Sequence, residues 1–345
     1  MNRLGLLGLV ASALVACSHP QPPVTPLPPE KPAEPVAKAE PPPAPVPPAP
    51  PKLAPFDIEL GAPGTATVKL VSPGKGKRVV ATVAPAAGGK TPVELHVDFT
   101  PTQDGTAQRT PTLILRGDAE VTAADKTGAQ YKITITATDT HYPEKLARID
   151  QLERGLAGVV GMTMTGNVTP DGEVGKLALH HDAAATMSSE VMKLFNVTWL
   201  PAWPVLPKEA IAPGAKWQAT TMYKLASQLD ITEVTDYELV SYKDKTWTIK
   251  GTSKVTGGDQ AAGEGVTLKD ISGTGTLQAT LVDGALIPTV HHTLTVAFTA
   301  AAPQGQLKLA LELGNDIGAP GTTPTPTPTP TPAPTPTPTP TPTRR

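Results

Sequence analysis

The chain has 345 residues, with 29 lysines and arginines against 31 aspartates and glutamates and a formal net charge of −2. A nearly neutral chain without a basic stripe lacks the electrostatic footprint of nucleic-acid binding. A single cysteine excludes a disulfide scaffold, which needs an even number of cysteines, and a zinc site built on several thiolates. We therefore expect no nucleic-acid partner and a fold held together by its apolar core.

The N-terminus has the pattern of a signal peptide. Met1-Asn2-Arg3 gives a positively charged start, and the apolar run Leu4–Ala16 has the length of a signal-peptide core. A membrane-spanning helix needs about 20 apolar residues, and the polar, proline-rich sequence that follows excludes an extension. The sequence predicts a signal peptide over residues 1–16.

Leu14-Val15-Ala16-Cys17 resembles the lipobox of bacterial lipoproteins. The resemblance implies that the Cys17 thiol carries a diacylglycerol, that cleavage makes Cys17 the new N-terminus, and that its amine is often acylated. Two or three acyl chains anchor a protein firmly. The alternative is an ordinary signal peptide with a cysteine near its cleavage site. In enterobacterial lipoproteins an aspartate after the cysteine favours retention in the inner membrane, so Ser18 favours the outer membrane, at its periplasmic face or the cell surface.

Two proline-rich segments flank the central region. Of the 42 prolines, 17 lie within the linker 17–55 and 11 lie within the tail 316–345, where threonine and proline alternate. Each proline removes a backbone donor, and such composition cannot bury enough apolar surface to fold. We expect both segments to be disordered, with the linker reaching outward at about 3.1 Å per residue of polyproline II.

The central region, residues 56–315, is predicted to be a mainly β (α+β) domain. Period-two alternation with turn residues between the runs is typical of antiparallel strands, and it is clearest at Thr65–Val71, Val93–Phe99, Thr112–Arg116, Tyr131–Thr138, Thr246–Lys250, Gly275–Leu281 and Thr289–Phe298. Helical spacing predicts two helices, within Pro143–Leu156 and Ala183–Phe195. We expect a curved antiparallel sheet or half-barrel with these helices packed on it. Similar turn motifs suggest a weak duplication of residues 60–182 and 212–300.

A proline-rich approach, Leu200–Pro207, precedes the Gly-x-x-Trp strand at Pro213–Trp217. This stretch resembles one found in uncharacterised bacterial lipoproteins. At the level of the fold, the region Phe56–Asn315 resembles lipoprotein carriers of the LolA, LolB and LppX type. That resemblance implies a curved antiparallel sheet covered by helices, but a fold alone does not assign a function.

Neither a catalytic nor a metal site is predicted. The tandem histidines His180-His181 and His291-His292 could bind an ion with His96 or His141 only if the strands met, because adjacent strand residues point to opposite faces. Gly88-Gly89-Lys90-Thr91 lacks the first glycine of a P-loop, and no serine stands in a Gly-x-Ser-x-Gly elbow. We therefore expect no enzyme activity and no cofactor.

Three of the four tryptophans, Trp199, Trp203 and Trp217, crowd one proline-rich stretch. They could line the mouth of an apolar cavity for an acyl chain or glycan, or they could pack a linker against the sheet. The packing role is the favoured interpretation.

The sequence thus predicts a non-enzymatic lipoprotein, anchored to the membrane through Cys17, whose β-rich domain binds an amphiphile, a glycan polymer or an envelope protein. Two alternatives remain: a carrier that holds a lipid or amphiphile in an apolar cavity, and an envelope hydrolase with converging histidines and carboxylates. An apolar cleft of several hundred cubic ångströms would favour the carrier.

Overall fold

A computed structural model describes residues 55–60, 66–108, 110–142, 153, 155–182, 203–225, 229–263 and 265–321. This part of the chain is built almost entirely of strands. They are β1 (Phe56–Leu60), β2 (Thr67–Ser72), β3 (Lys90–Gln103), β4 (Thr106–Ala107), β5 (Thr112–Asp125), β6 (Gly128–His141), β7 (Thr163–Val168), β8 (Leu177–His181), β9 (Lys216–Leu225), β10 (Leu229–Lys243), β11 (Thr246–Thr256), β12 (Gln260–Ala261), β13 (Thr267–Val282), β14 (Thr289–Ala302) and β15 (Gly305–Gly318).

The strands form one antiparallel sheet. Its order is β1-β8-β7-β6-β5-β3-β15-β14-β13-β11-β10-β9-β2, with β4 paired to β3 and β12 to β13. The prediction of a mainly β fold with an antiparallel sheet is confirmed. Most strands are longer than the alternating runs that predicted them: Tyr131–Thr138 lies inside the 14 residues of β6, and Thr289–Phe298 inside the 14 residues of β14. The exception is β2, whose six residues overlap the run Thr65–Val71.

Local sequence explains both the strands and their turns. In β11 the buried residues alternate with exposed threonines and lysines from Trp247 onward, as expected for a strand with one face in the core. The two-residue turn between β10 and β11 is Asp244-Lys245, with φ angles of 51° and 60°. Both are left-handed, as a type I′ hairpin requires. The hairpin fixes the register in which Lys243 pairs with Thr246.

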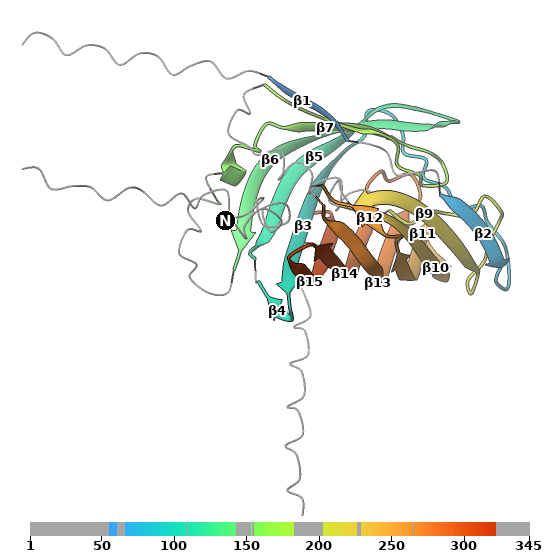
Figure 1. Ribbon diagram of the computed structural model, residues 1–345. Helices are drawn as coiled ribbons and strands as arrows, with labels where there is room; N and C mark the ends of the chain where they lie inside the picture. Colours follow the sequence, from blue (N-terminus) through green and yellow to red (C-terminus); the bar gives the residue numbers. More distant parts are fainter. Residues whose placement is uncertain are drawn as a thin grey trace, which may run out of the picture.

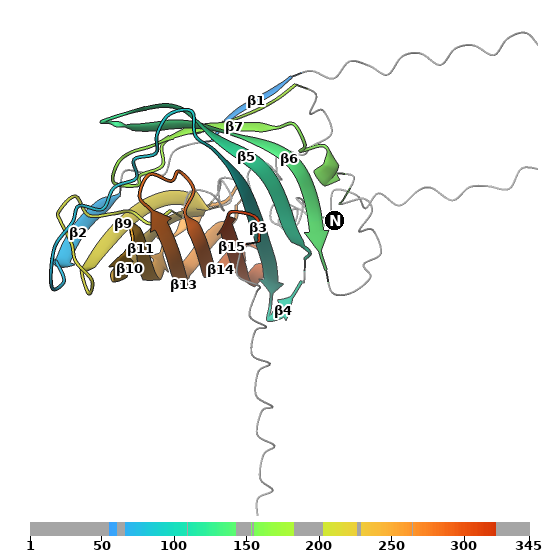
Figure 2. The same cartoon turned by 180° about the vertical axis from the view of Figure 1, so that it is seen from behind.

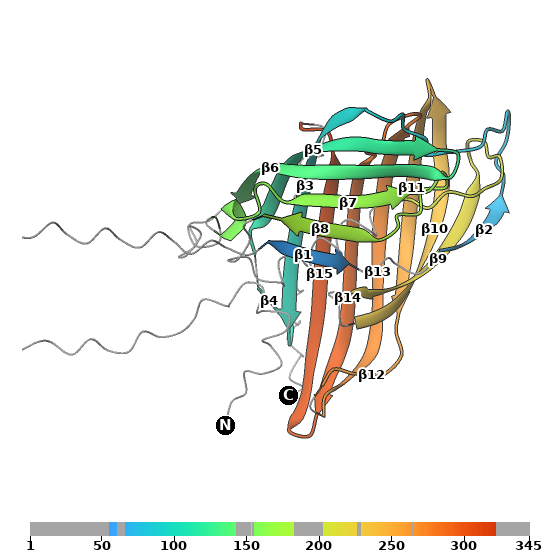
Figure 3. The same cartoon turned by 90° about the horizontal axis from the view of Figure 1, so that it is seen from above.

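The sheet folds over on itself into two layers. β3 makes the corner, because its residues Lys90–Val97 pair with β5 while Glu94–Gln103 pair with β15. We call β1, β8, β7, β6 and β5 the upper layer and β15, β14, β13, β11, β10, β9 and β2 the lower layer (Figure 1, Figure 2). Figure 3 shows that the strands of the upper layer cross those of the lower one. This is the orthogonal arrangement in which corner strands pass between layers.

Chain connectivity shows how strong the curvature is. β1 and β2 form the two opposite edges of the sheet, although only six residues separate Leu60 from Thr67. That connection can span at most about 25 Å, whereas the edges of a flat sheet with this strand order would lie about 55–60 Å apart. The folded sheet must therefore bring its two edges near each other.

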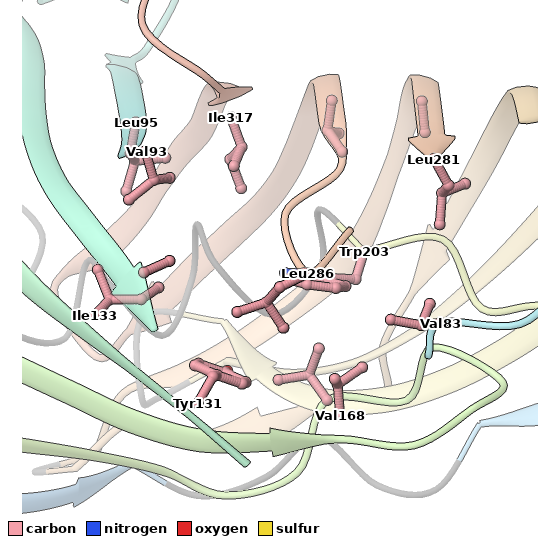
Figure 4. Packing of buried hydrophobic residues seen from close by; sticks show 14 of the residues in the cluster. Val83, Val93, Leu95, Tyr131, Ile133, Val168, Trp203, Leu281, Leu286 and Ile317 are labelled. Carbon is pink, nitrogen blue, oxygen red and sulfur yellow. The ribbon is translucent and has the colours of Figure 1, made fainter. Parts of the chain in front are cut away.

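The main core lies between the two layers. Tyr131, Ile133 and Met164 contribute from the upper layer, and Trp217 and Leu239 contribute from the lower layer; all are at most 1% exposed. Figure 4 shows side chains of this cluster pointing toward one another from several strands and from the loops that carry Val83, Trp203 and Leu286. Burial of apolar area at about 25 cal/mol per Å² makes this cluster the main source of stability.

A second apolar cluster lies at the other end of the lower layer. All its buried members come from β9 to β15 and their connections: Leu225, Leu229, Ile231, Val255, Val266, Leu268, Ile271, Leu294, Val296, Phe298, Ala300, Leu311 and Leu313. They share the face that carries the main core, because the residue numbers of the two sets on one strand differ by an even number, as for Val290 and Leu294. Leu268 of β13 departs from this spacing because the bulge between Lys269 and Ser272 shifts the alternation. One inner face thus carries both clusters.

The prediction of about two helices on the sheet is not confirmed. Helical residues in the described part of the chain are limited to Glu153 and Gly155–Ala157, at the end of the first predicted segment. There, glycines at 155, 158 and 161 disfavour a helix, and the chain continues in turns in which Val159 N–H donates to the Leu156 carbonyl at 2.8 Å. Residues 143–152 and 183–195 lie outside the described residues. Within the described residues, no helix has the length and apolarity that crossing a membrane requires.

Candidate functional site

The tandem histidines split between the two faces of their strands. On β14, His291 points outward and its Nδ1 lies 2.5 Å from Asp316 Oδ1, whereas the adjacent His292 is buried at 2% exposure on the inner face. The hydrogen bond with Asp316 raises the pKa of His291. His180, on β8 of the upper layer, instead contacts Asp57 at 2.8 Å and Asp182 at 3.1 Å. No group of three metal-ligating side chains occurs among the residues that the structure describes.

The tryptophans lie in the core. Trp203 and Trp217 belong to the main cluster, at 2% and 1% exposure. The Trp217 ring stacks on Tyr237 with centroids 5.3 Å apart, and its indole N–H donates to the Val205 carbonyl at 2.8 Å. These contacts fasten the loop after Trp203 onto β9. Trp199 and Cys17 lie outside the described residues.

Buried acids on the outer face have basic partners. Glu94 accepts hydrogen bonds from Arg116 Nε at 2.6 Å and from His96 Nε2 at 2.8 Å. Asp316, 4% exposed, accepts from His291. Since a buried charge is costly unless it is paired, these contacts form two ordinary structural groups, one on β3 and β5 and one on β14 and β15.

The inner face of the lower layer, unlike the outer face, carries a band of polar residues and glycines that separates its two apolar clusters. Along β14, for example, Val290 of the main cluster is followed on the same face by His292 and then by Leu294 of the second cluster. Along β15 the corresponding order is Ile317, Asn315 and Leu313. The same interruption occurs on all six strands from β9 to β15, β12 aside. We call this the interior polar band: Tyr223, Glu233, Thr235, Gly251, Ser253, Gly273, Gly275, His292 and Asn315.

One half of the interior polar band is internally hydrogen bonded. Tyr223 donates to Glu233 Oε2 at 2.7 Å, and Thr235 donates to Glu233 Oε1 at 3.5 Å. The Thr235 and Ser253 hydroxyls lie 2.8 Å apart, so Ser253 can donate in turn to Thr235. Burial and then the charge of Glu233 raise the pKa of Tyr223, which keeps the phenol protonated as a donor. Glu233 therefore has hydrogen-bond donors around it but no cation within hydrogen-bond distance among the described residues.

The other half of the interior polar band is not satisfied. His292 Nδ1 and both polar atoms of the Asn315 amide, Oδ1 and Nδ2, are buried without a hydrogen-bond partner. The two residues are register partners on β14 and β15, and they are 2% and 1% exposed. Burial lowers the pKa of His292, while the charge of Glu233 acts in the opposite direction. His292 is thus neutral at neutral pH, and the carboxylate of Glu233 lies near enough to act on it.

Glycines leave the middle of the interior polar band without side chains. Gly275 of β13 is the register partner of Ser253 and the diagonal neighbour of His292, whereas Gly251 of β11 pairs with Tyr237 and Leu277. A Cβ at Gly275 would lie 2.7 Å from the Thr293 carbonyl oxygen, and one at Gly251 would lie 3.1 Å from the Tyr237 ring. Only glycine fits the backbone at Gly275 without displacement of its neighbour.

Unsatisfied buried polar atoms are rare, because each forfeits the hydrogen bonds it makes with water. Three such atoms lie on two neighbouring residues, where a group able to donate and accept hydrogen bonds could reach them. Among the described residues, the Ser253 hydroxyl bonds to the Thr235 hydroxyl, which in turn bonds to Glu233.

Sequence reasoning missed this site. Each strand shows only one or two polar residues at inward positions, which by themselves look like ordinary variation within an apolar alternation. The signal was present in Val290-x-His292-x-Leu294 and in Leu313-x-Asn315-x-Ile317. The register pairs His292 with Asn315 and Ser253 with Gly275. Between β13 and β14 it pairs His292 with Leu277 and Gly275 with Leu294, so the two halves of the band meet only diagonally.

A family model described as a family of unknown function (DUF6263) matches residues 176–282, which is under a third of the chain. The match runs from just before β8 to the end of β13, so it includes the half of the interior polar band formed by Tyr223, Glu233, Thr235 and Ser253. His292 and Asn315 lie beyond it. A search of curated proteins returned no match to this chain.

Proposed function

We propose that this protein is a non-enzymatic, lipid-anchored lipoprotein of the cell envelope whose β-rich domain binds a ligand inside its folded sheet. The observation that carries the binding role is the pair of unsatisfied buried side chains, His292 and Asn315, in the interior polar band. The lipobox-like Leu14–Cys17 carries the anchor. Ser18 favours the outer membrane, and the proline-rich linker lets the domain stand away from the bilayer.

Of the two alternatives, a carrier is favoured over an envelope hydrolase. The side chains that would bind the ligand, His292 and Asn315, lie between two apolar clusters, as in a site for an amphiphile. A hydrolase needs a nucleophile or a polarised water beside a general base. On the outer face His180 bonds to Asp57 and His291 to Asp316, whereas on the inner face Nδ1 of His292 has no hydrogen-bond partner. The inner carboxylate, Glu233, accepts from Tyr223 and Thr235.

The anchor is tested by Cys17→Ala. We expect the variant to lose membrane retention and the acyl mass on its N-terminal peptide, because the thiol is the lipid attachment point. Cell fractionation and mass spectrometry of that peptide provide the measurement. Ser18→Asp is the matched control: it leaves acylation intact and, in an enterobacterial host, shifts the protein toward the inner membrane. Membrane association that survives Cys17→Ala, together with an unacylated wild-type peptide, would refute the anchor.

Ligand binding is tested on the full-length protein purified from its own membranes. We expect native mass spectrometry to show an adduct at about one ligand per chain, which is lost in the double variant His292→Leu/Asn315→Leu. Thr295→Leu and Glu312→Leu are the controls, since these exposed residues lie on the same two strands but face outward. An adduct equally present in the double variant would place the ligand elsewhere. No adduct in the wild type, with no ligand released on denaturation, would count against binding altogether.

A further inference from the structure

We infer that the ligand is an amphiphile with an uncharged head group that both donates and accepts hydrogen bonds, held by His292 and Asn315. The inference rests on the proposed function, and it names the class of ligand. Long-chain alcohols, monoacylglycerols and fatty amides belong to this class. Fatty-acid anions, phospholipids and amines do not.

The hydrogen-bonding inventory of the two side chains sets the head group. An asparagine amide offers two N–H donors and a carbonyl acceptor, and here both ends are buried without a partner. A carboxylate or a phosphate diester accepts but does not donate, so it would leave Oδ1 of Asn315 unsatisfied. An ammonium donates but does not accept, so it would leave Nδ2 unsatisfied. A hydroxyl or an amide can serve both ends.

The geometry allows one small head group to reach both residues. His292 and Asn315 are directly paired on neighbouring antiparallel strands and share the inner face. Side chains in such a pair have Cβ atoms about 4.5–5.5 Å apart. The two hydroxyls of a glycerol head could therefore bond to His292 Nδ1 and to the Asn315 amide together.

The charges around the site disfavour an ionic head. The buried polar residues of the described chain include no lysine or arginine, so an anion at His292 and Asn315 would have no cationic partner. Burial lowers the pKa of His292 and so keeps its ring neutral, while the negative charge of Glu233 acts on that pKa in the opposite direction. Glu233 could attract a cation, but both of its oxygens already accept hydrogen bonds, from Tyr223 and Thr235.

The apolar neighbours indicate that the rest of the ligand is a hydrocarbon. Leu294 and Leu313 follow the two residues on the inner face and begin the second apolar cluster. The buried members of that cluster come from β9 to β15 and their connections and are at most 8% exposed, and Phe99 of β3 packs against them. An acyl chain that extends from the head group along the inner face would lie among these side chains.

The test uses four probes that share one oleyl or oleoyl chain: 1-monooleoylglycerol, oleate, methyl oleyl phosphate, which is a phosphate diester without hydroxyls, and oleylamine. Binding to the full-length lipidated protein in amphipol is measured by gel filtration of radiolabelled probe. We expect saturable binding of about one monooleoylglycerol per chain, with each charged probe at least about tenfold weaker. Asn315→Leu and His292→Leu should each weaken monooleoylglycerol binding by about tenfold, the effect of roughly 1.4 kcal/mol at 25 °C. Glu312→Leu should leave the affinity unchanged.

Each other result overturns the inference. A charged probe that binds as tightly as monooleoylglycerol would reject the neutral head group while leaving the proposed binding function intact. Monooleoylglycerol binding that is insensitive to both leucine substitutions would reject the site. Absence of saturable binding for all four probes would reject the amphiphile. In that case the adduct experiment on protein from its own membranes still decides separately whether the protein binds any ligand.

Discussion

Replacing Trp217 by alanine is expected to destabilise the domain by about 3–5 kcal/mol, the range for truncating a large aromatic residue in a packed core. Trp217 is 1% exposed, stacks on Tyr237 and donates its indole hydrogen to the Val205 carbonyl. The substitution therefore opens a cavity between the layers, removes the ring contact and leaves the Val205 carbonyl without this donor. Urea unfolding followed by circular dichroism measures the loss.

Two further variants separate these contributions. Trp217→Phe keeps much of the aromatic packing but removes the hydrogen bond to Val205, so we expect a smaller loss than for alanine. Met222→Ala is the matched control, because Met222 lies on the same strand with 66% of its surface exposed. Exposed substitutions usually change stability by no more than about 0.5 kcal/mol. A loss below about 1 kcal/mol for Trp217→Ala would show that this ring does not join the loop and the two layers.

The strands were predictable because the alternation of apolar and polar residues in each strand reflects one buried and one exposed face. In β14 apolar side chains recur on one face, at Val290, Leu294, Val296 and Phe298. Such a pattern indicates a strand with one face in a core, independently of the rest of the sequence. Turn residues were equally local, as at Asp244-Lys245. Antiparallel pairing follows from short turns between such strands.

The layering was harder to predict because it depends on where strands bend and change partners. β3 reads as one continuous strand, yet it pairs with β5 in its first part and β15 in its second. At the register shift between Arg116 and Gly117 the strand β6 carries an extra residue, Thr136, and such a bulge bends the strand that contains it. A Cβ at Gly117 would lie 2.5 Å from the Thr134 carbonyl oxygen. Nothing in the alternation of a single strand specifies these bends.

The candidate site was invisible for a related reason. In the sequence, His292 stands out only as half of a tandem pair and Asn315 only as the end of the predicted domain, because the two residues are far apart along the chain. Register places them side by side, and His292 Nδ1 and both polar atoms of the Asn315 amide have no hydrogen-bond partner. Trp203 and Trp217 lie in the main core, in line with the packing role that the sequence favoured.

Replacing Asn315 by leucine is expected to stabilise the ligand-free protein, by roughly 1–3 kcal/mol for the relief of its unsatisfied amide. Leucine has a similar size, and Asn315 lies between Leu313 and Ile317 on the inner face. The direction of the change in stability is informative, because removing a buried polar group whose hydrogen bonds contribute to the fold would lower the free energy of unfolding. Thermal unfolding of the protein stripped of ligand provides the measurement, and a lower melting temperature for Asn315→Leu would show that the amide is satisfied in the folded state.

Ser253→Ala is the control, because its hydroxyl lies 2.8 Å from that of Thr235 in the same interior polar band. Loss of that bond should destabilise the domain by about 1 kcal/mol. Bound ligand should narrow the advantage of Asn315→Leu over wild type. At a hundredfold excess over the wild-type Kd, ligand stabilises wild type by about 2.7 kcal/mol and a tenfold weaker binder by about 1.4 kcal/mol. A stability difference that changes by about 1.3 kcal/mol between the empty and the loaded protein is what a binding site predicts and a purely structural asparagine does not.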